Sequence, residues 1–168
     1  MTPESREPVS SSATSDNDVT VHFLDDLVPG QRFAGGTPMR IDADRAAAFA
    51  AEFDPQPFHL DENAAANSIF GGIAASGWHT AAGTMRLLVD GEFTPAGGVV
   101  GAGFEELASP RPVRPGDELR VEVEVLQVRP SNTRPEQGMA KIRTVTLNQH
   151  DEIVQRSVGN IVVRRRPR

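Results

Sequence analysis

The chain has 168 residues, which suits a single folding unit, because domains usually run to about 100–150 residues. Its 17 Lys and Arg against 23 Asp and Glu give a net charge of −6, and it has no cysteine and no apolar run of about 18 residues. These counts exclude disulfides, thiolate metal sites and a bilayer-spanning helix, and they lead us to expect a soluble, cytoplasmic protein whose partners are neither nucleic acids nor membranes.

The first 18 residues differ in composition from the rest of the chain. They are rich in Ser, Asp, Glu and Pro, with almost nothing to bury and no apolar core for a secretory signal. Such a segment cannot offset its own ordering entropy, so we expect a disordered tail over 1–18 and one domain over 19–168. Inside the domain, Pro29-Gly30 predicts a turn before a short strand.

A first helix is predicted over residues 42–53. Its apolar positions fall at helical spacing and form one stripe: Ala46, Phe49, Ala50 and Phe53. Asp42 is placed to cap the helix at its start, and Asp54-Pro55 ends it because a residue before proline is driven out of the helical region.

A second helix is predicted over Gly77–Val89. Its longest apolar stripe consists of Trp78, Ala81, Ala82, Met85, Leu88 and Val89. The opposite side carries few charges, and a helix that is apolar nearly all round is usually buried. We therefore expect this helix at the centre of the fold.

Beyond residue 91 the pattern changes from helix to strand. Leu119–Val125 alternates apolar and charged residues, as a half-buried strand does, after a turn at Pro115-Gly116-Asp117. Further strands are predicted over Met139–Gln149 and Glu152–Arg165, joined around His150, and over Phe104–Val113. Long strands with short turns after one buried helix predict an α+β fold in which an antiparallel sheet curls around a central helix.

Two ionisable residues in the segment after the first helix suggest acid–base chemistry. Asp54 and His59 flank two prolines, which we expect to impose an extended, stiff bend and to aim both side chains into one cavity. Asp54 also stands at the C-terminal end of a helix, where the dipole would raise its proton affinity. The alternative is that Asp54 caps a turn and His59 packs in the core.

Gly77 opens the second helix. A helix N-terminus exposes unpaired N–H groups, and glycine allows a ligand close to the backbone, so these groups would suit an oxyanion hole. The alternative is that Ser76 caps the helix and Gly77 is merely small.

The motif D-P-Q-P-F-H-L-D at 54–61, followed by I-A-A-S-G-W at 73–78, resembles the MaoC-type dehydratase or (R)-specific enoyl-CoA hydratase family. Asp54, Pro57, His59, Asp61 and Gly77 match the family pattern in identity and order. The segments Arg111–Ser131 and Val145–Val154 are also similar to it, and the resemblance covers roughly residues 20–166.

This resemblance implies a single hot-dog domain, a homodimer whose sheets join edge to edge, and acyl-CoA sites near the subunit interface. It implies that Asp54 and His59 activate a water that adds to a trans-2-enoyl-CoA to give a (3R)-hydroxyacyl-CoA, a step of fatty acid metabolism. Gly77 N–H would stabilise the enolate, and no metal or cofactor is expected beyond the coenzyme A of the substrate.

The chain departs from the family pattern at Gln56, where Asn is commoner, and at Ser76, where many members have His. Ser76, Trp78 and Phe58 are candidates for shaping the substrate pocket, although Trp78 suits the core equally well. Arg114, Arg111 and the cluster Arg164–Arg168 are candidates for the CoA phosphates, or else solvated surface arginines. Asp61 is expected to cap a short helix over Glu62–Ala66.

Two other functions remain open from sequence. A hot-dog acyl-CoA thioesterase would keep the fold, but it generally uses a differently placed carboxylate. A non-catalytic acyl-binding partner subunit would not need Asp54 and His59, which are both present.

Overall fold

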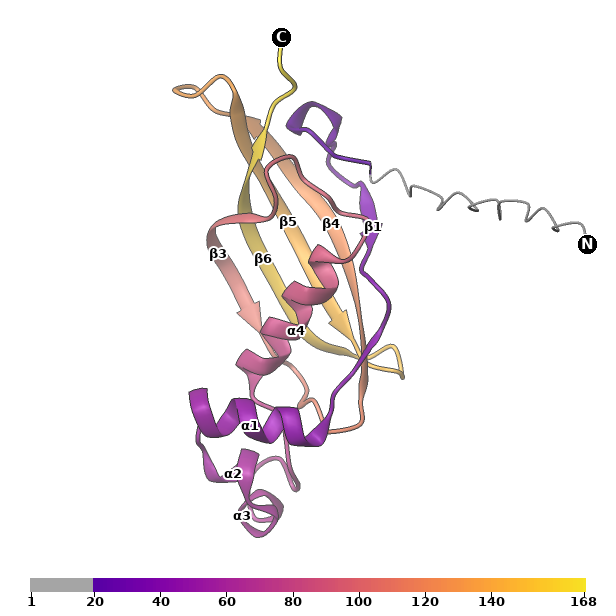
Figure 1. Ribbon diagram of the computed structural model, residues 1–168, viewed down its shortest axis with the longest axis vertical. Helices are drawn as coiled ribbons and strands as arrows, with labels where there is room; N and C mark the ends of the chain where they lie inside the picture. The colour runs from indigo at the N-terminus through magenta and orange to yellow at the C-terminus, as the bar shows by residue number, and fades with distance from the viewer. Residues whose placement is uncertain (1–19) are drawn as a thin grey trace, which may run out of the picture.

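The computed structural model describes residues 20–168, so the tail predicted over 1–18 lies outside the described residues. One antiparallel sheet carries a long helix across one of its faces, and three short helices gather at one end of the sheet (Figure 1). The helical elements are η1 (Leu24–Asp26), α1 (Ala43–Phe53), α2 (Pro57–Leu60), α3 (Glu62–Ala66) and α4 (Gly77–Val89). The strands are β1 (Arg32–Ala34), β2 (Met39–Arg40), β3 (Val100–Ala108), β4 (Glu118–Pro130), β5 (Gln137–Leu147) and β6 (Ile153–Arg164).

The six-stranded sheet has the order β1-β4-β5-β6-β3, with β2 also paired to β4. Every pairing of named strands is antiparallel, and α4 packs on one face of the sheet, which is the arrangement of the hot-dog fold. The α+β expectation is therefore confirmed. None of the described helices is long and apolar enough to cross a membrane.

The strand predictions hold to within two residues for β5 and β6. They hold for the start of β4, which runs on five residues past Val125, but not for β3. This strand begins four residues before Phe104 and ends at Ala108, because Pro110 and Pro112 follow it in a non-strand loop. It forms a free edge of the sheet, and its pairing with β6 is interrupted at Gly101/Gly103 and at Phe104/Glu106 by irregularities typical of β-bulges.

The core lies between α4 and the sheet. Leu119, Val121, Val123 and Val125 are all buried, and the residues between them face outward, as the alternating pattern predicts. The helix approaches closely at Gly83, where an added Cβ would lie 2.5 Å from Met39 Cε.

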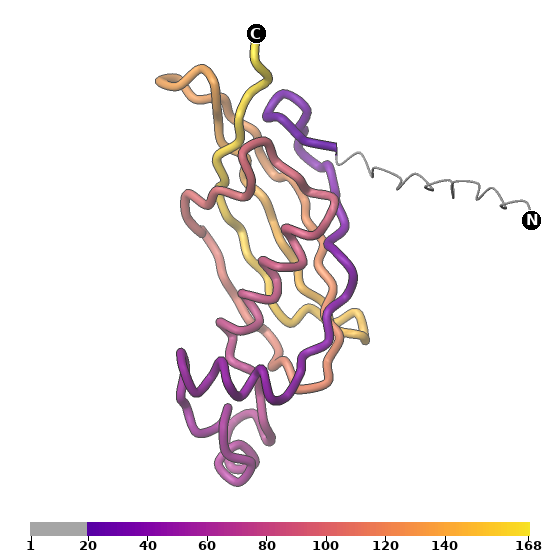
Figure 2. Tube along the Cα trace, viewed as in Figure 1, coloured from indigo at the N-terminus to yellow at the C-terminus, as the bar shows by residue number. Residues whose placement is uncertain are grey.

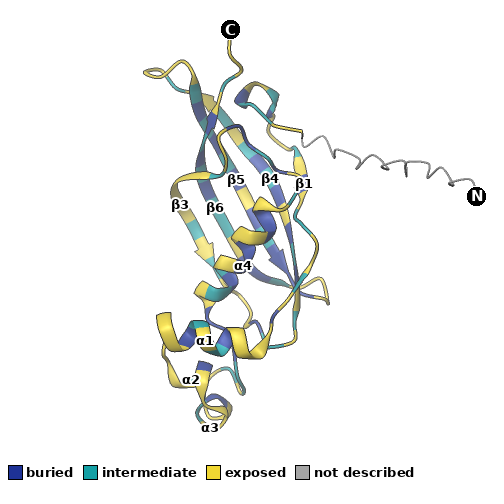
Figure 3. Ribbon diagram, in the orientation of Figure 1, coloured by how far each residue is buried: buried dark blue, intermediate teal, exposed yellow. Residues whose placement is uncertain are grey.

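Of the predicted stripe of α4, only Leu88 is buried, so most of that stripe is not the face that packs on the sheet. The buried residues of the helix are Thr80, Gly83, Thr84, Leu87 and Leu88. Trp78 is 64% exposed, and Met85 and Val89 are also exposed. Figure 3 shows exposed positions along α4. Small and hydroxylated residues allow the helix to lie close to the sheet, so the bulkier apolar side chains are left on the outer face.

The two ends of the sheet differ in content. Helices α1–α3 pack beneath the start of α4, whereas the β4–β5 hairpin, η1 and the C-terminus lie at the opposite end (Figure 2). Asp42 caps α1 as predicted, accepting a hydrogen bond from Arg45 N–H at 2.9 Å. Of the predicted α1 stripe, Ala46 and Ala50 are buried, but Phe53 is exposed at the end of the helix.

Candidate active site

Asp54 is the residue that ends α1, and its N–H bonds to Ala50 O at 2.9 Å. The extended bend predicted between Asp54 and His59 is wrong in its second half, because Pro57 opens the short helix α2. Proline is well tolerated there, since the first residue of a helix has no intrahelical use for its N–H. The turn of helix directs His59 back toward Asp54, so both residues face the same cavity.

His59 is held by contacts on both ring nitrogens. It is only 7% exposed, its Nδ1 lies 2.6 Å from Ala74 O, and its Nε2 lies 3.2 Å from Asp54 Oδ2. Phe58 stands edge-on to the imidazole ring. Because a carbonyl oxygen only accepts, Nδ1 must carry a hydrogen, and Nε2 is left facing the carboxylate. This contact is favourable when a proton lies between Nε2 and Oδ2.

Asp54 receives two further hydrogen bonds. Gln56 Nε2 donates to Oδ1 at 2.8 Å, and Ser76 Oγ donates to Oδ2 at 2.7 Å. The Gln56 bond, followed by the Ser76 bond, lowers the pKa of Asp54 below its usual value. The expected rise in proton affinity from the helix dipole is therefore wrong: direct donors to the carboxylate outweigh the dipole of α1.

Ser76 contacts both α4 and Asp54. It is fully buried, caps α4 by accepting the Trp78 N–H at 3.2 Å, and donates to Asp54. Gly77 comes next as the first residue of the helix, and a Cβ placed there would meet only Ser109 Oγ, at 3.8 Å. Among the described residues, no acceptor is found for the Gly77 N–H.

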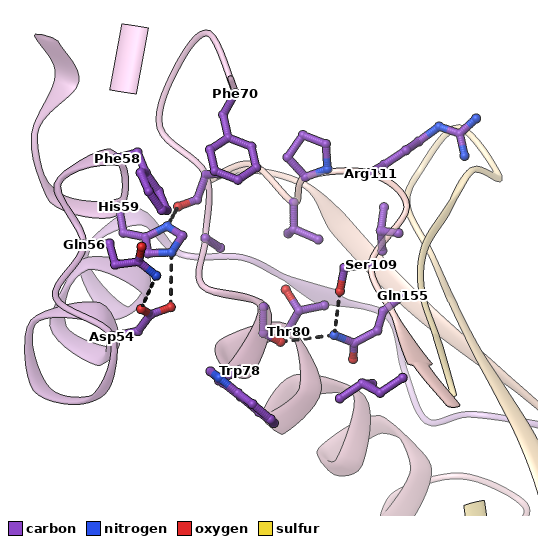
Figure 4. Close-up of a pocket in the computed structure, with 17 residues that line it drawn as sticks. Asp54, Gln56, Phe58, His59, Phe70, Trp78, Thr80, Ser109, Arg111 and Gln155 are labelled. Carbon is purple, nitrogen blue, oxygen red and sulfur yellow. Dashed lines mark hydrogen bonds and ion pairs between the residues drawn. The ribbon is translucent and has the colours of Figure 1, made fainter. Parts of the chain in front are cut away.

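A cavity of about 400 Å³ joins these groups. Asp54, His59 and Gln56 lie on one side of it, and Ser109 and Gln155 lie across from them (Figure 4). Its remaining walls include Phe58, Phe70, Gly77, Trp78, Leu107 and Arg111. The geometry can hold a small polar molecule against the Asp54–His59 pair while an apolar group extends past Trp78 and Leu107.

A second, narrower groove of about 130 Å³ continues from this cavity between α4, β3 and β6. It shares Trp78, Leu107 and Gln155 with the first cavity, and its lining is mostly apolar. Trp78 therefore belongs to the pocket wall, so the alternative that places it in the core is wrong.

Arg114 occupies a different position from the one expected for a phosphate ligand. Its guanidinium donates to the carbonyls of Phe70, Gly72 (2.8 Å) and Ile73 (3.0 Å), so it clamps the loop before α4. Arg111 is instead the arginine at the cavity, paired with Glu152 at 3.5 Å.

The other predicted residues fall outside the cavity. Asp61 caps α3, accepting the Ala64 N–H at 2.7 Å. The C-terminal arginines lie at the far end of the sheet, where Arg165 and Arg166 pair with Asp25 and Asp26. Within one chain they are remote from Asp54.

Sequence reasoning missed Gln155, Ser109 and Phe70 as parts of the cavity wall. Gln155 is 3% exposed. Its strand was predicted from the sequence pattern alone, and no pocket residue was assigned to it. A buried glutamine is uncommon, and its neighbours Val154 and Arg156 gave no signal that this one would face the cavity. Among residues 20–168, no group of three or more His, Asp or Glu is arranged to hold a metal ion.

Comparison with known proteins assigns the family. The model of the MaoC like domain matches residues 26–147. The chain belongs to the MaoC-like dehydratase family.

Three known proteins are similar to this chain over most of its length. The crystal structure of a MaoC-like dehydratase from Rhodospirillum rubrum is 55% identical, with a TM-score of 0.83 over 88% of this chain and 99% of that one. The R-hydratase PhaJ1 from Pseudomonas aeruginosa is 27% identical, with a TM-score of 0.65 over 86% of each chain. The uncharacterized protein YdeM of Bacillus subtilis is 33% identical over 142 residues, which are 84% of this chain and 99% of YdeM.

Proposed function

We propose that this MaoC-like protein adds water reversibly to a trans-2-enoyl-CoA, giving a (3R)-hydroxyacyl-CoA. The observation that carries the proposal is that Asp54, His59 and Gly77 line one cavity. An acid–base pair and a free backbone donor are the two elements that hydration of an enoyl thioester requires. The similarity to the R-hydratase PhaJ1 supports the same class of reaction.

Asp54 and His59 are proposed to hold and polarise the attacking water. The lowered pKa of Asp54 keeps its carboxylate ionised at neutral pH, ready to accept a hydrogen bond from the water. The water oxygen forms a bond to C3, and its departing proton passes to the Asp54–His59 pair. The electron pair of the C2=C3 bond moves onto the thioester oxygen as an enolate.

The enolate then collapses, and the pair returns a proton to C2. Water has been added across the double bond, and the pair is back in its starting state. Asp54 and His59 lie on one side of the cavity, which supports addition of both groups to the same face of the alkene. Dehydration follows the same steps in reverse.

The Gly77 N–H is proposed to donate to the thioester oxygen while charge develops there. It is the first N–H of α4, so it gains from the positive end of the helix dipole, and it has no acceptor among the described residues. The acyl chain would extend into the apolar groove beside Trp78 and Leu107. Phe58 would close the opposite wall.

We also propose that a second copy of this chain completes the pocket as a homodimer. The outer face of α4 and the free edge β3 together expose six large apolar side chains: Trp78, Met85, Val89, Val100, Phe104 and Leu107. Such a patch beside an unpaired strand is typical of an interface. Two of its members, Trp78 and Leu107, also line the cavity, so a partner seated here would border the site.

The proposed reaction is tested by the loss of enoyl-thioester ultraviolet absorbance with crotonyl-CoA and longer trans-2-enoyl-CoAs. Asp54→Asn and His59→Ala should each lower kcat by about 10²–10⁴-fold, as loss of a general acid–base group does. The product should be the 3R alcohol. Release of free CoA would instead identify a thioesterase, and inactivity across the panel would contradict the proposal in favour of an acyl-binding partner.

The dimer is tested by light scattering on the wild type and on Phe104→Glu. Phe104 is 68% exposed on β3, so the substitution should leave the fold of one chain unchanged. We expect twice the chain mass for the wild type and the single-chain mass for the variant. A wild type of single-chain mass would contradict the dimer.

A further inference from the structure

Gln155 on β6 is a buried polar residue that the proposed mechanism does not use. It is 3% exposed, and its neighbour Val154 is 1% exposed. Successive residues of a regular strand point to opposite faces, so two adjacent buried residues need an explanation. The β5–β6 register supplies it: Thr146 pairs with Gln155, but Leu147 pairs with Ile153, which leaves Val154 as an extra residue. Gln155 lies opposite the buried Thr146, on the same face as Ser157 and Gly159, so regular alternation directs its side chain into the cavity, and the β-bulge adds Val154 beside it.

The orientation of the Gln155 amide is fixed by its partners. Nε2 donates to Gly77 O at 3.1 Å and lies 3.3 Å from Ser109 Oγ (Figure 4). A main-chain carbonyl accepts only, so the nitrogen, and not the oxygen, must face Gly77. The contact connects β6 to the first turn of α4 across the cavity wall.

Gly77 is thereby held from two sides. On its helix side, Trp78 N–H donates to Ser76 Oγ, and on its sheet side the Gly77 carbonyl receives Gln155 Nε2. Neither contact uses the Gly77 N–H, which stays available. Glycine has the widest backbone freedom of any residue, so its direction in the first turn depends on such contacts.

We propose that Gln155 is a positioning residue, which aims the Gly77 N–H at the thioester oxygen by holding the Gly77 carbonyl. This role rests on the proposed hydratase function. The donor must lie within about 2.7–3.1 Å of the developing oxyanion, and a displacement of about 1 Å can lower the rate by about 10²-fold. Gln155 acts through Gly77.

Steady-state kinetics of Gln155→Met give the first test. Methionine keeps the length of the side chain and removes the donor. We expect kcat to fall by about 10–100-fold, with KM changed much less, because the interaction with the thioester oxygen strengthens in the transition state. Gln149→Met is the matched control: this exposed glutamine also makes two hydrogen bonds, to Asp117 and Glu118, but lies outside the cavity. It should leave both constants unchanged.

Gln155→Glu provides a second readout that a purely structural role would not move. At neutral pH the carboxylate repels the Gly77 carbonyl, whereas the protonated acid can donate to it again. Activity relative to the wild type should therefore recover as the pH is lowered toward the pKa of the new carboxyl group. A ratio that stays constant with pH would overturn the role. The same variant serves if Gln155→Met fails to fold.

Absorbance spectroscopy of a bound ligand tests, without turnover, whether the Gly77 N–H points at the thioester oxygen. In a His59→Ala background, a bound 2,4-dienoyl-CoA should absorb at longer wavelength, because a donor at the carbonyl polarises the conjugated system. His59→Ala/Gln155→Met should bind the same ligand with a smaller shift. An equal shift in both proteins, with an active wild type, would overturn the role of Gln155 alone. A wild type inactive on every enoyl-CoA would overturn the proposed function, and this role with it.

Discussion

Carboxylates with lowered pKa values occur at both ends of the sheet, but they are built differently. At the C-terminal end, Asp25 owes its lowered pKa first to a hydrogen bond from Arg165. At the helical end, Asp54 owes its lowered pKa first to Gln56 and then to Ser76, which are neutral donors. The charge of Asp25 is balanced by an ion pair with Arg165 at the surface, whereas Asp54 receives its hydrogen bonds from neutral groups and borders a cavity.

This comparison shows that a lowered pKa alone does not mark a functional site. Exposed pairs such as Asp25–Arg165 are screened by solvent and usually contribute little to stability. What distinguishes Asp54 is an ionisable neighbour, His59, together with the Gly77 N–H, which borders the same cavity. The predictions below test that difference.

The largest expected effect separates the two carboxylates directly. Asp54→Asn should lower kcat by about 10²–10⁴-fold with little loss of stability, because the asparagine amide has the same shape: its oxygen can still accept from Gln56, and its NH2 group can donate to Ser76 Oγ. Asp25→Asn should leave kcat and KM unchanged. Both variants are measured by hydration assays and thermal unfolding, and an equal loss of activity in the two would refute the comparison.

Arg114 offers a test of the loop that supports the site. Arg114→Lys should lower the melting temperature and kcat/KM together, because an ammonium cannot reproduce the fork that serves three carbonyls of the loop. The loop leads to Ala74, whose carbonyl anchors His59. Arg111→Lys, at the cavity rim, is the control variant, and its melting temperature should equal that of the wild type.

The opposite result for Arg114 would be informative. A raised KM for CoA substrates at an unchanged melting temperature would indicate contact with the CoA phosphates, as the sequence first suggested for this residue.

Ser76→Ala should affect both the helix and the carboxylate. Loss of the cap should destabilise the protein by about 1 kcal/mol, a typical cost of removing an N-cap. Loss of the bond to Oδ2 should raise the pKa of Asp54 toward its usual value. A lowered carboxyl pKa stabilises the folded state above the unfolded pKa, and this contribution is lost as the pH falls through the folded pKa. Denaturant unfolding at neutral pH and below about pH 4 should therefore show a smaller acid-dependent loss in the variant.

The smallest effect concerns His79, whose Nδ1 is buried without a partner in the described structure. Burial, followed by the charge of Arg45, lowers its pKa in the folded state. Below the unfolded pKa of about 6.5 the unfolded chain binds the proton first, so stability falls as the pH decreases. His79→Gln should flatten this dependence in unfolding titrations, whereas His150→Gln, at an exposed turn, should not.

Local signals predicted much of the fold. The bounds of α4 and the caps at Asp42, Asp61 and Ser76 followed from the sequence, because capping is decided within three or four residues. The alternation in β4 likewise identified its buried face. The outer face of α4 was assigned wrongly, because hydrophobicity does not say which side of an apolar helix can come closest to a sheet.

The site was predicted where the motif was local and missed where it was not. Asp54, His59 and Gly77 lie within 24 residues of one another and were found together. Gln155 reaches the cavity from a strand 78 residues beyond Gly77, and Arg114 contacts its carbonyls from the other side of the loop, more than 40 residues along the chain. Such placements depend on strand register, which the pattern of residues does not reveal.

The irregular course of β3 has a consequence for solubility. An unpaired strand presents a row of N–H and C=O groups on which further chains can add, the first step toward fibrous aggregates. Here two interruptions fall within the nine residues of the strand, and Gly103 adopts a φ of 137° that few other residues accept. The regular stretches of this edge are therefore too short for other chains to add to it one after another. The glycines of β3 thus limit aggregation at high protein concentration.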